Sequence, residues 1–297
     1  MCVEKKIASY IHPMKLFVCC CFQLASFFSF AQSQPAQDPQ GMLFIIGGGT
    51  RSPALIEKMV SLARMRVNDY VVVLPMASAE PDSSFFYLER DLKPFCRQTI
   101  SYLNFTKDRV HDKSWIDSLS QARLIFITGG DQNRFMKLVL HTQVHDAIVK
   151  AYNRGAMIAG TSAGAAVMSK EMITGNELIG DSAVSGSFKS IRYDMVELKE
   201  GLGLIQNAII DQHFVARSRY NRLLSVLAEH PAYACIGVDE GTALIVQGSA
   251  LTVTGTGQVI RLMLPAGKHN REKDSLVKLQ NIRMDIFTAG DQFSLPK

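Results

Sequence analysis

Ser162 lies in the segment GTSAGAAVMS, residues 160–169, with a glycine two positions to each side. An apolar run, residues 156–159, precedes the segment, and small residues that favour a helix follow it. A strand that turns into a helix at G-x-S-x-G is typical of a nucleophile elbow, whose sharp turn needs small neighbours. The hydroxyl would then point into a crevice, where the N–H of Ala163 could stabilise an oxyanion. A serine that merely caps a helix is the alternative.

A nucleophilic serine needs a base, and three histidines follow Ser162 in the chain, His213, His230 and His269. His213 follows the apolar run 207–210 and precedes a helical pattern, which places it at the carboxyl end of a strand. His230 stands where that helix ends, and His269 stands in a polar loop. Position therefore favours His213 as the catalytic base, with a purely structural strand-end histidine as the alternative.

Several carboxylates are candidates for the acid that orients the base. Glu240 is the first choice, because it follows another apolar strand. Glu177 and Asp181 follow the elbow and are alternatives, whereas Asp211 is too near His213 in sequence to orient it easily. The resulting order, Ser…His…acid, differs from the Ser…acid…His order of α/β-hydrolases, but a triad is defined by geometry rather than by order.

Two further segments carry polar groups at strand ends. The turn Gly129-Gly130 would let a second backbone N–H approach the substrate, and Asp131 and Gln132 could contact polar substrate groups. A plain strand-to-helix turn capped by Asp131 is the alternative. Arginines at positions 217, 219 and 222 follow the candidate base closely, and guanidinium groups there would bind carboxylates. The alternative for these arginines is a solvated helix face.

Other classes of function have little support. The glycines at 47–49 lack the G-x-G-x-x-G spacing of a dinucleotide site, so they predict a tight turn near the substrate. No Cys/His/Asp cluster has the spacing of metal ligands, and we expect neither a metal nor a cofactor. A net charge of +5 without long blocks of like charge does not suggest nucleic-acid binding.

Apolar, β-branched runs alternate with longer helical patterns along the chain and would position these residues. Strands are expected at 42–46, 70–76, 99–105, 122–128, 156–160 and 207–210, and helices at 52–65, 82–95 and 133–154, the last interrupted near Thr142. Continuously apolar strands, each followed by a helix, indicate a mostly parallel sheet sandwiched by helices, with its site at the carboxyl ends of the strands. From about residue 242, runs separated by tight glycine turns predict antiparallel β additions toward the C-terminus.

Residues 1–31 have the pattern of a secretory signal peptide, and Met14 is an alternative start. The apolar run 16–30 is short for a membrane span, so we expect no stable membrane insertion after cleavage at Ala31; an uncleaved anchor is the alternative. Residues 32–41 are predicted as a disordered linker and 42–297 as a single α/β domain.

Cleavage of the signal peptide would leave two cysteines, Cys96 and Cys235. In an oxidising periplasmic or extracellular compartment they could form a disulfide. Because both lie in or beside apolar runs, two buried free thiols are the alternative.

Together these motifs resemble the cyanophycinases, serine peptidases related to dipeptidase E with a class I glutamine-amidotransferase-like fold. The resemblance rests on IIGGGT, ITGGDQ, GTSAGAAVMS, GLGLIQNAIIDQHFVARSRYNRLL and GVDEGTALIV, which recur in the family order within residues 42–247. It implies Ser162 as nucleophile, His213 as base and Glu240 as acid. It also implies an oxyanion hole formed by the backbone N–H groups of Gly130 and Ala163. The substrate pocket that it implies consists of Gln132, Asp211, Gln212, Arg217, Arg219 and Arg222.

The resemblance further implies a homodimer that hydrolyses cyanophycin, a poly-aspartate whose side chains are amidated by arginine, to β-Asp-Arg dipeptides through an acyl-enzyme. Export would suit an enzyme that degrades polymer released by other cells. A dipeptidase-E-like exopeptidase for short Asp-containing peptides and an inactive ligand-binding relative are the alternatives. The expected loop 175–199 is longer than in typical members and could border the cleft, which leaves the preferred substrate length open.

Overall fold

The computed structural model describes residues 41–179, 188–264 and 276–295. The expected signal peptide, residues 1–31, lies outside the described residues, as does the expected linker up to residue 40. Within the described ranges, no helix is both long enough and apolar enough to cross a membrane.

The central sheet has eight strands in the order β14-β11-β10-β1-β5-β4-β2-β3. Its parallel part comprises β1 (Met42–Ile46), β2 (Tyr70–Leu74), β3 (Thr99–Tyr102), β4 (Leu124–Ile127) and β5 (Met157–Thr161). Apart from β3 these strands are buried almost throughout, as expected for apolar runs covered on both faces. Antiparallel strands extend the sheet beyond β1, as predicted: β10 (Thr242–Gln247), β11 (Ala250–Gly255) and β14 (Gln292–Ser294).

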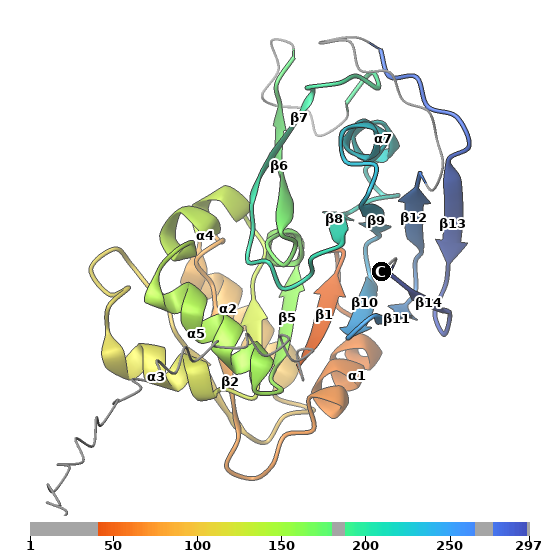
Figure 1. Cartoon of the computed structure of the whole chain (residues 1–297). Coiled ribbons are helices and arrows are strands. Elements are labelled where there is room, and N and C mark those ends of the chain that lie inside the picture. The colour runs from red at the N-terminus through yellow and green to blue at the C-terminus, as the bar shows by residue number, and fades with distance from the viewer. Residues whose placement is uncertain (1–40, 180–187, 265–275, 296–297) are drawn as a thin grey trace, which may run out of the picture. The chain divides into compact units, whose positions relative to one another are not determined.

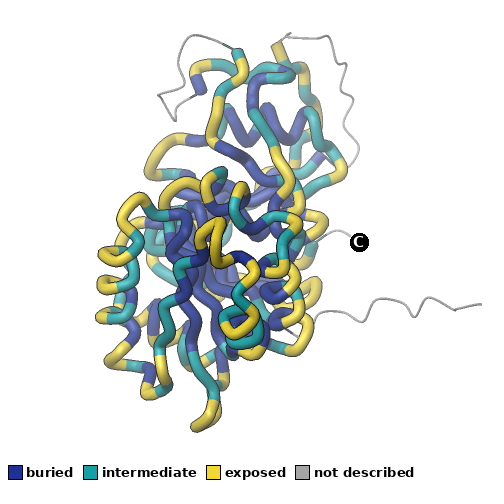
Figure 2. Tube along the Cα trace, turned by 90° about the vertical axis from the view of Figure 1, so that its left-hand side faces the viewer, coloured by how far each residue is buried: buried dark blue, intermediate teal, exposed yellow. Residues whose placement is uncertain are grey.

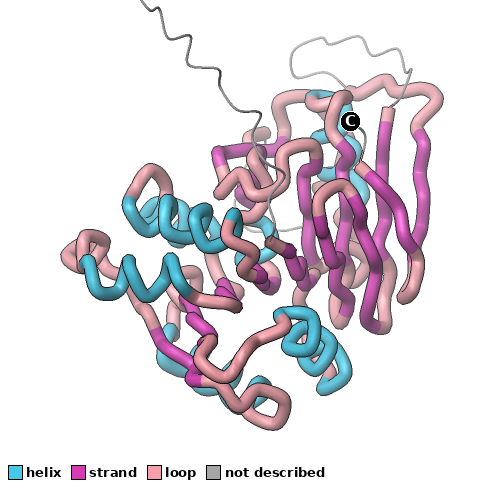
Figure 3. Tube along the Cα trace, turned by 60° about the horizontal axis from the view of Figure 1, so that its bottom comes forward, coloured by secondary structure: helices cyan, strands magenta, loops and turns pink. Residues whose placement is uncertain are grey.

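Helices cover both faces of this sheet (Figure 3). On one face lie α1 (Pro53–Ala63) and α2 (Pro81–Leu92); on the other lie α3 (Lys113–Gln121), α4 (Gln132–Val139) and α5 (Gln143–Asn153). The predicted break near Thr142 is confirmed, because its side chain accepts a hydrogen bond from the Val144 N–H and caps α5. The expected α/β class with a largely parallel central sheet is therefore correct.

A second sheet carries the candidate base. Its order is β13-β12-β9-β8, in which β8 (Ala208–Gln212) and β9 (Ala234–Val238) are parallel, and β12 (Val259–Met263) and β13 (Arg283–Phe287) are antiparallel. Helix α7 (Tyr220–Glu229) packs on this sheet (Figure 1). The expectation of one sheet for all the catalytic strands was therefore wrong. The two sheets meet where β1 ends, since the His213 N–H donates to the Gly47 carbonyl at 2.7 Å.

The region after the elbow also differs from the expectation. Helix α6 (Ala163–Ala166) is a single turn, and the chain then enters β6 (Glu171–Glu177), which pairs with the antiparallel β7 (Val196–Glu200). The expected loop 175–199 therefore begins within β6 and ends within β7, the two paired strands of a hairpin. Its residues 180–187 lie outside the described residues. Figure 2 shows buried strands in the interior and partly exposed helices and loops around them.

Candidate active site

Ser162 directly follows β5 and has backbone angles of φ 53° and ψ −111°. A non-glycine residue adopts this strained conformation only where its surroundings enforce it. A Cβ atom added to Gly160 would lie 2.3 Å from the Gly164 carbonyl oxygen, and one added to Gly164 would lie 2.1 Å from the Ile127 oxygen. The turn therefore requires glycine at both positions. Because the Ser162 side chain makes no capping hydrogen bond, the interpretation as a simple helix cap is wrong.

His213 bridges the serine and a carboxylate. Its Nε2 lies 2.8 Å from Ser162 Oγ, and its Nδ1 lies 2.5 Å from Glu240 Oε1. In a neutral imidazole, Nδ1–H would donate to Glu240 while Nε2 accepts from the serine hydroxyl. Of the two alternative acids, Glu177 lies in β6 and makes no hydrogen bond with His213, and Asp181 lies outside the described residues.

The surroundings of His213 favour its neutral form. Burial, the largest effect, lowers the pKa of His213 below its ordinary value of 6.5. Glu240 acts in the opposite direction by stabilising the imidazolium, whereas the positive charges of Arg217 and Arg219 lower the pKa further. The imidazole is therefore ready to accept a proton at neutral pH.

The glycine turn after β1 holds this triad of side chains in place. A Cβ added to Gly48 would lie 2.2 Å from Cε1 of His213, and one added to Gly49 would lie 2.7 Å from Cβ of Glu240. The Gly48 carbonyl also accepts a hydrogen bond from the N–H of Gly241, the residue after Glu240. The turn was expected near the substrate, but the residues it packs against are the base and its carboxylate.

We therefore expect Gly48→Ala to lower kcat by about two orders of magnitude, because a misplacement of about 1 Å in a catalytic group has an effect of this size. Gly248→Ala is the matched control, since Gly248 also has a positive φ (56°) but no atom within 4 Å of an added Cβ. Gly248→Ala should lose about 1 kcal/mol of stability from backbone strain, and Gly48→Ala should lose more, because its new Cβ also collides with the His213 ring. A Gly48→Ala enzyme with unchanged kcat would contradict this role for the turn.

A polar cleft of about 280 Å³ opens beside Ser162. Of the six expected substrate-pocket residues, five line it: Gln132, Gln212, Arg217, Arg219 and Arg222. Of these, Gln132 donates to the carbonyls of Ile173 and Thr174 at 3.0 and 2.7 Å, which ties β6 to the start of α4. Arg217 is exposed, and no ion pair engages it among the described residues.

Asp211 lies beneath the cleft rather than in its lining. Its side chain is completely buried and receives Arg222, whose Nε donates to Oδ2 at 2.7 Å and whose Nη2 donates to Oδ1. Arg219 Nη1 lies 3.4 Å from the same carboxylate and donates to both Gln212 oxygens, at 2.8 and 2.9 Å. Both arginines are almost fully buried, so for them the alternative of a solvated helix face is wrong.

The second glycine turn, Gly129-Gly130, packs against the nucleophile elbow. Gly130 has φ 139°, and an added Cβ would lie 2.1 Å from the Ala77 carbonyl oxygen. One added to the preceding Gly129 would lie 3.4 Å from Cβ of Ser162, so this turn and the elbow are in contact. Asp131 caps α4, with Oδ1 accepting from the backbone N–H of Asn133 and Arg134.

Sequence reasoning missed several residues of the site. Asp239 accepts from the N–H groups of Val215 and Ala216, so it fixes the chain just after His213. Thr174 and Asn176 reach the cleft lining from β6, a strand that the sequence pattern did not indicate. For Asp239 a signal existed, since it stands beside Glu240 at a strand end. For the residues of β6 there was none.

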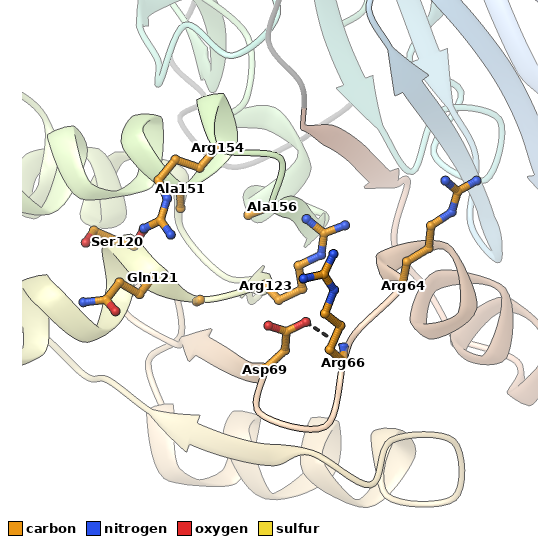
Figure 4. Close-up of a pocket in the computed structure, with 10 residues that line it drawn as sticks. Arg64, Arg66, Asp69, Ser120, Gln121, Arg123, Ala151, Arg154 and Ala156 are labelled. Carbon is orange, nitrogen blue, oxygen red and sulfur yellow. Dashed lines mark hydrogen bonds between the residues drawn. The ribbon is translucent and has the colours of Figure 1, made fainter.

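A larger hollow, of about 550 Å³, lies at the amino ends of β2, β4 and β5 (Figure 4). It contains none of the expected site residues. Two of its four arginines satisfy helix C-termini: Arg123 donates to the carbonyls of Ala63 and Gly155, and Arg154 donates to that of Ser120. These bonds give Arg123 and Arg154 a structural explanation, and the chemistry lies at the opposite edge of the sheet.

Both cysteines of the described residues are free and buried, which decides between the two expectations in favour of separate thiols. Cys96 belongs to the cluster beneath α1 and α2, and Cys235 to the cluster beneath α7. Burial raises the pKa of both thiols, so neither is poised as a thiolate nucleophile. Across residues 41–179, 188–264 and 276–295 no group of three or more His, Cys, Asp or Glu side chains could hold a metal ion.

Comparison with known proteins gives consistent findings. The model of peptidase family S51 matches residues 43–254. A cyanophycinase of Nostoc sp. is 32% identical over 233 residues, which cover 76% of this chain and 75% of that protein. A peptidase E of Actinobacillus pleuropneumoniae is 29% identical over 152 residues, 48% of this chain and 59% of that protein. The crystal structure of a peptidase from an acI-B1 Actinobacterium superposes with a TM-score of 0.62 at 20% identity, over 86% of this chain and 98% of that one.

Proposed function

The chain belongs to peptidase family S51 and is a serine-type peptidase, and we propose that it is an exported hydrolase of cyanophycinase type. The observation that carries the proposal is the chain of contacts from Ser162 Oγ through His213 to Glu240, at 2.8 and 2.5 Å, beneath a strained elbow. The fold that we propose for it is of the class I glutamine-amidotransferase-like type. The signal-like pattern of residues 1–31 supports export, which fractionation of cells that express the full chain would test.

In the proposed mechanism, His213 Nε2 takes the hydroxyl proton as Ser162 Oγ attacks the scissile carbonyl carbon. Glu240 stabilises the imidazolium that forms. The backbone N–H groups of Gly130 and Ala163 donate to the oxyanion, and among the described residues neither donates to a backbone carbonyl. His213 then protonates the leaving amine, and an acyl-enzyme remains. Water, deprotonated by His213, hydrolyses the ester and frees Ser162.

The charges around the cleft support a substrate that carries both a carboxylate and a guanidinium group. On the α7 side, Arg217 offers a guanidinium that forms no ion pair with any of the described residues. On the α4 side, Asp131 uses Oδ1 for capping, which leaves Oδ2 available to a cation. Each arginine attached to a cyanophycin aspartate presents a free carboxylate and a guanidinium, so a branch of this polymer matches both walls.

The proposal is tested by incubating residues 32–297 with insoluble cyanophycin and analysing the soluble products by mass spectrometry. Release of β-Asp-Arg is the expected result. Cleavage of short Asp-initiated peptides without release from the polymer would move the assignment to a dipeptidase-E-like exopeptidase. That alternative has some support from the similarity to peptidase E. No hydrolysis of either substrate would contradict both assignments.

The pH profile of this hydrolysis should reflect the environment of His213. Because burial lowers the pKa of the base, kcat/KM should hold its plateau to below pH 6.5 and fall at lower pH, as His213 becomes protonated. Arg217→Gln removes a positive charge that lowers this pKa, so its acid limb should move to higher pH. Arg217→Lys keeps the charge and should leave the limb in place. Equal shifts in the two variants would contradict the electrostatic explanation.

A further inference from the structure

Two hollows continue from the catalytic cleft around α4. The cleft shares Asn133 with a hollow of about 420 Å³, and that hollow shares Lys137 with another of about 490 Å³. Asn133 and Lys137 are four residues apart in one helix, so they occupy the same face. We call the two outer hollows the α4 track; its cations are Lys107, Arg134, Lys137 and Lys199, and its apolar side chains include Met76, Phe105 and Leu138.

The four cations of the α4 track are exposed; Lys199 pairs with Glu197 at 3.0 Å, and the other three have no acidic partner among the described residues. Among the described residues, Lys107 and Lys137 form no ion pair, and Arg134 donates one guanidinium N–H to the Ala77 carbonyl at 3.2 Å. Glu200, the carboxylate that lines the inner hollow, lies 3.1 Å from His141.

The apolar part of the track lies between these cations. Met76 and Phe105 are buried and Leu138 is half-buried, so the floor of the outer hollow is hydrocarbon. Cations around a hydrocarbon floor suit branches that carry a carboxylate beside an aliphatic arm, because the arm packs while the carboxylate pairs.

We propose that the α4 track binds the branches of an extended substrate that lie beyond the reacting unit, through the carboxylate and the methylene arm that each branch carries. This inference rests on the proposed function, and it gives the enzyme a preference for long substrate chains over short ones. Each branch carries its carboxylate on the carbon from which the methylene arm and its guanidinium extend. Carboxylates of successive branches pair with Arg134, Lys137 and Lys107. The methylene arms lie on Met76, Phe105 and Leu138, and the guanidinium groups extend into solvent. The cleft beside Ser162 then holds only the unit that is cleaved.

The test uses Lys107→Gln/Lys137→Gln, with Lys58→Gln/Lys150→Gln as the matched control, since all four lysines are exposed and both pairs remove two charges. Binding is measured in a Ser162→Ala background by cosedimentation with insoluble cyanophycin at low ionic strength, so it does not depend on hydrolysis. We expect about fivefold weaker binding for the track variant, consistent with the loss of two exposed ion pairs, and no change for the control. In the Ser162 background, kcat/KM for the shortest cleavable substrate should stay within about twofold of wild type.

Equal binding by the track and control variants, or no binding by the Ser162→Ala protein, would overturn the inference. The inference would also be overturned if the track variant lost as much kcat/KM on the shortest substrate as it lost binding to the polymer. The lysines would then act on the cleft itself. The proposed function fails on a different result, the absence of β-Asp-Arg release by the wild-type enzyme.

Discussion

Ser162→Ala should lower kcat for hydrolysis by at least about four orders of magnitude, because the acyl-enzyme route is lost with the nucleophile. The remaining activity would come from substrate binding and the oxyanion donors alone. The fold should be unchanged, since the Ser162 side chain does not cap α6 and its strained backbone is imposed by Gly160 and Gly164. Product release is measured by mass spectrometry and thermal unfolding by circular dichroism, on the same preparations.

Labelling provides an independent control for this result. A fluorophosphonate should modify the wild-type protein at Ser162, and His213→Ala should label far more slowly, because the 2.8 Å contact to Nε2 that activates the hydroxyl is gone. A Ser162→Ala protein that keeps its activity would contradict the assignment. A folded wild-type protein that does not label would instead support an inactive relative that only binds its ligand.

The fold was predictable where burial is strong and local. The strand expected at 42–46 coincides with β1, because an apolar run that is buried on both faces carries its own signal. Five elements were not predicted: α3, β6, β7, β13 and β14. They are partly polar, and pairing partners rather than composition define the strands among them. Strand pairing also placed β8 and β9 in a second sheet, which a list of strands does not reveal.

The sequence could predict which strand ends form the site. It could not predict which side chains at those ends face the nucleophile. Asp239 and Glu240 are adjacent, yet Glu240 faces His213 while Asp239 faces the N–H groups of residues 215 and 216. Asp211 and His213 lie two residues apart, but His213 has φ 49°, so the chain turns between them and only the histidine enters the site. Such choices depend on tertiary contacts, and no spacing rule along the sequence contains them.

Asp211→Ala should lower the free energy of unfolding by about 3–5 kcal/mol, the effect of removing one partner from a buried ion pair. Asp211 is fully buried, and the guanidinium groups of Arg222 and Arg219 are only 2% and 6% exposed. Removal of the carboxylate would leave both cations without their acidic partner in a site from which water is largely excluded. Denaturant unfolding followed by circular dichroism measures the loss.

The matched control is Asp211→Leu/Arg222→Leu, which removes both members of the closest pair together. Replacing a whole buried ion pair by apolar side chains of similar volume is often neutral, so this variant should be clearly more stable than Asp211→Ala. Arg219 would keep its hydrogen bonds to Gln212. A direct substrate contact predicts a different pattern, in which Asp211→Ala unfolds like wild type but has a raised KM. Loss of stability would instead show that Asp211 acts through the arginines and Gln212, whose positions in the cleft depend on it.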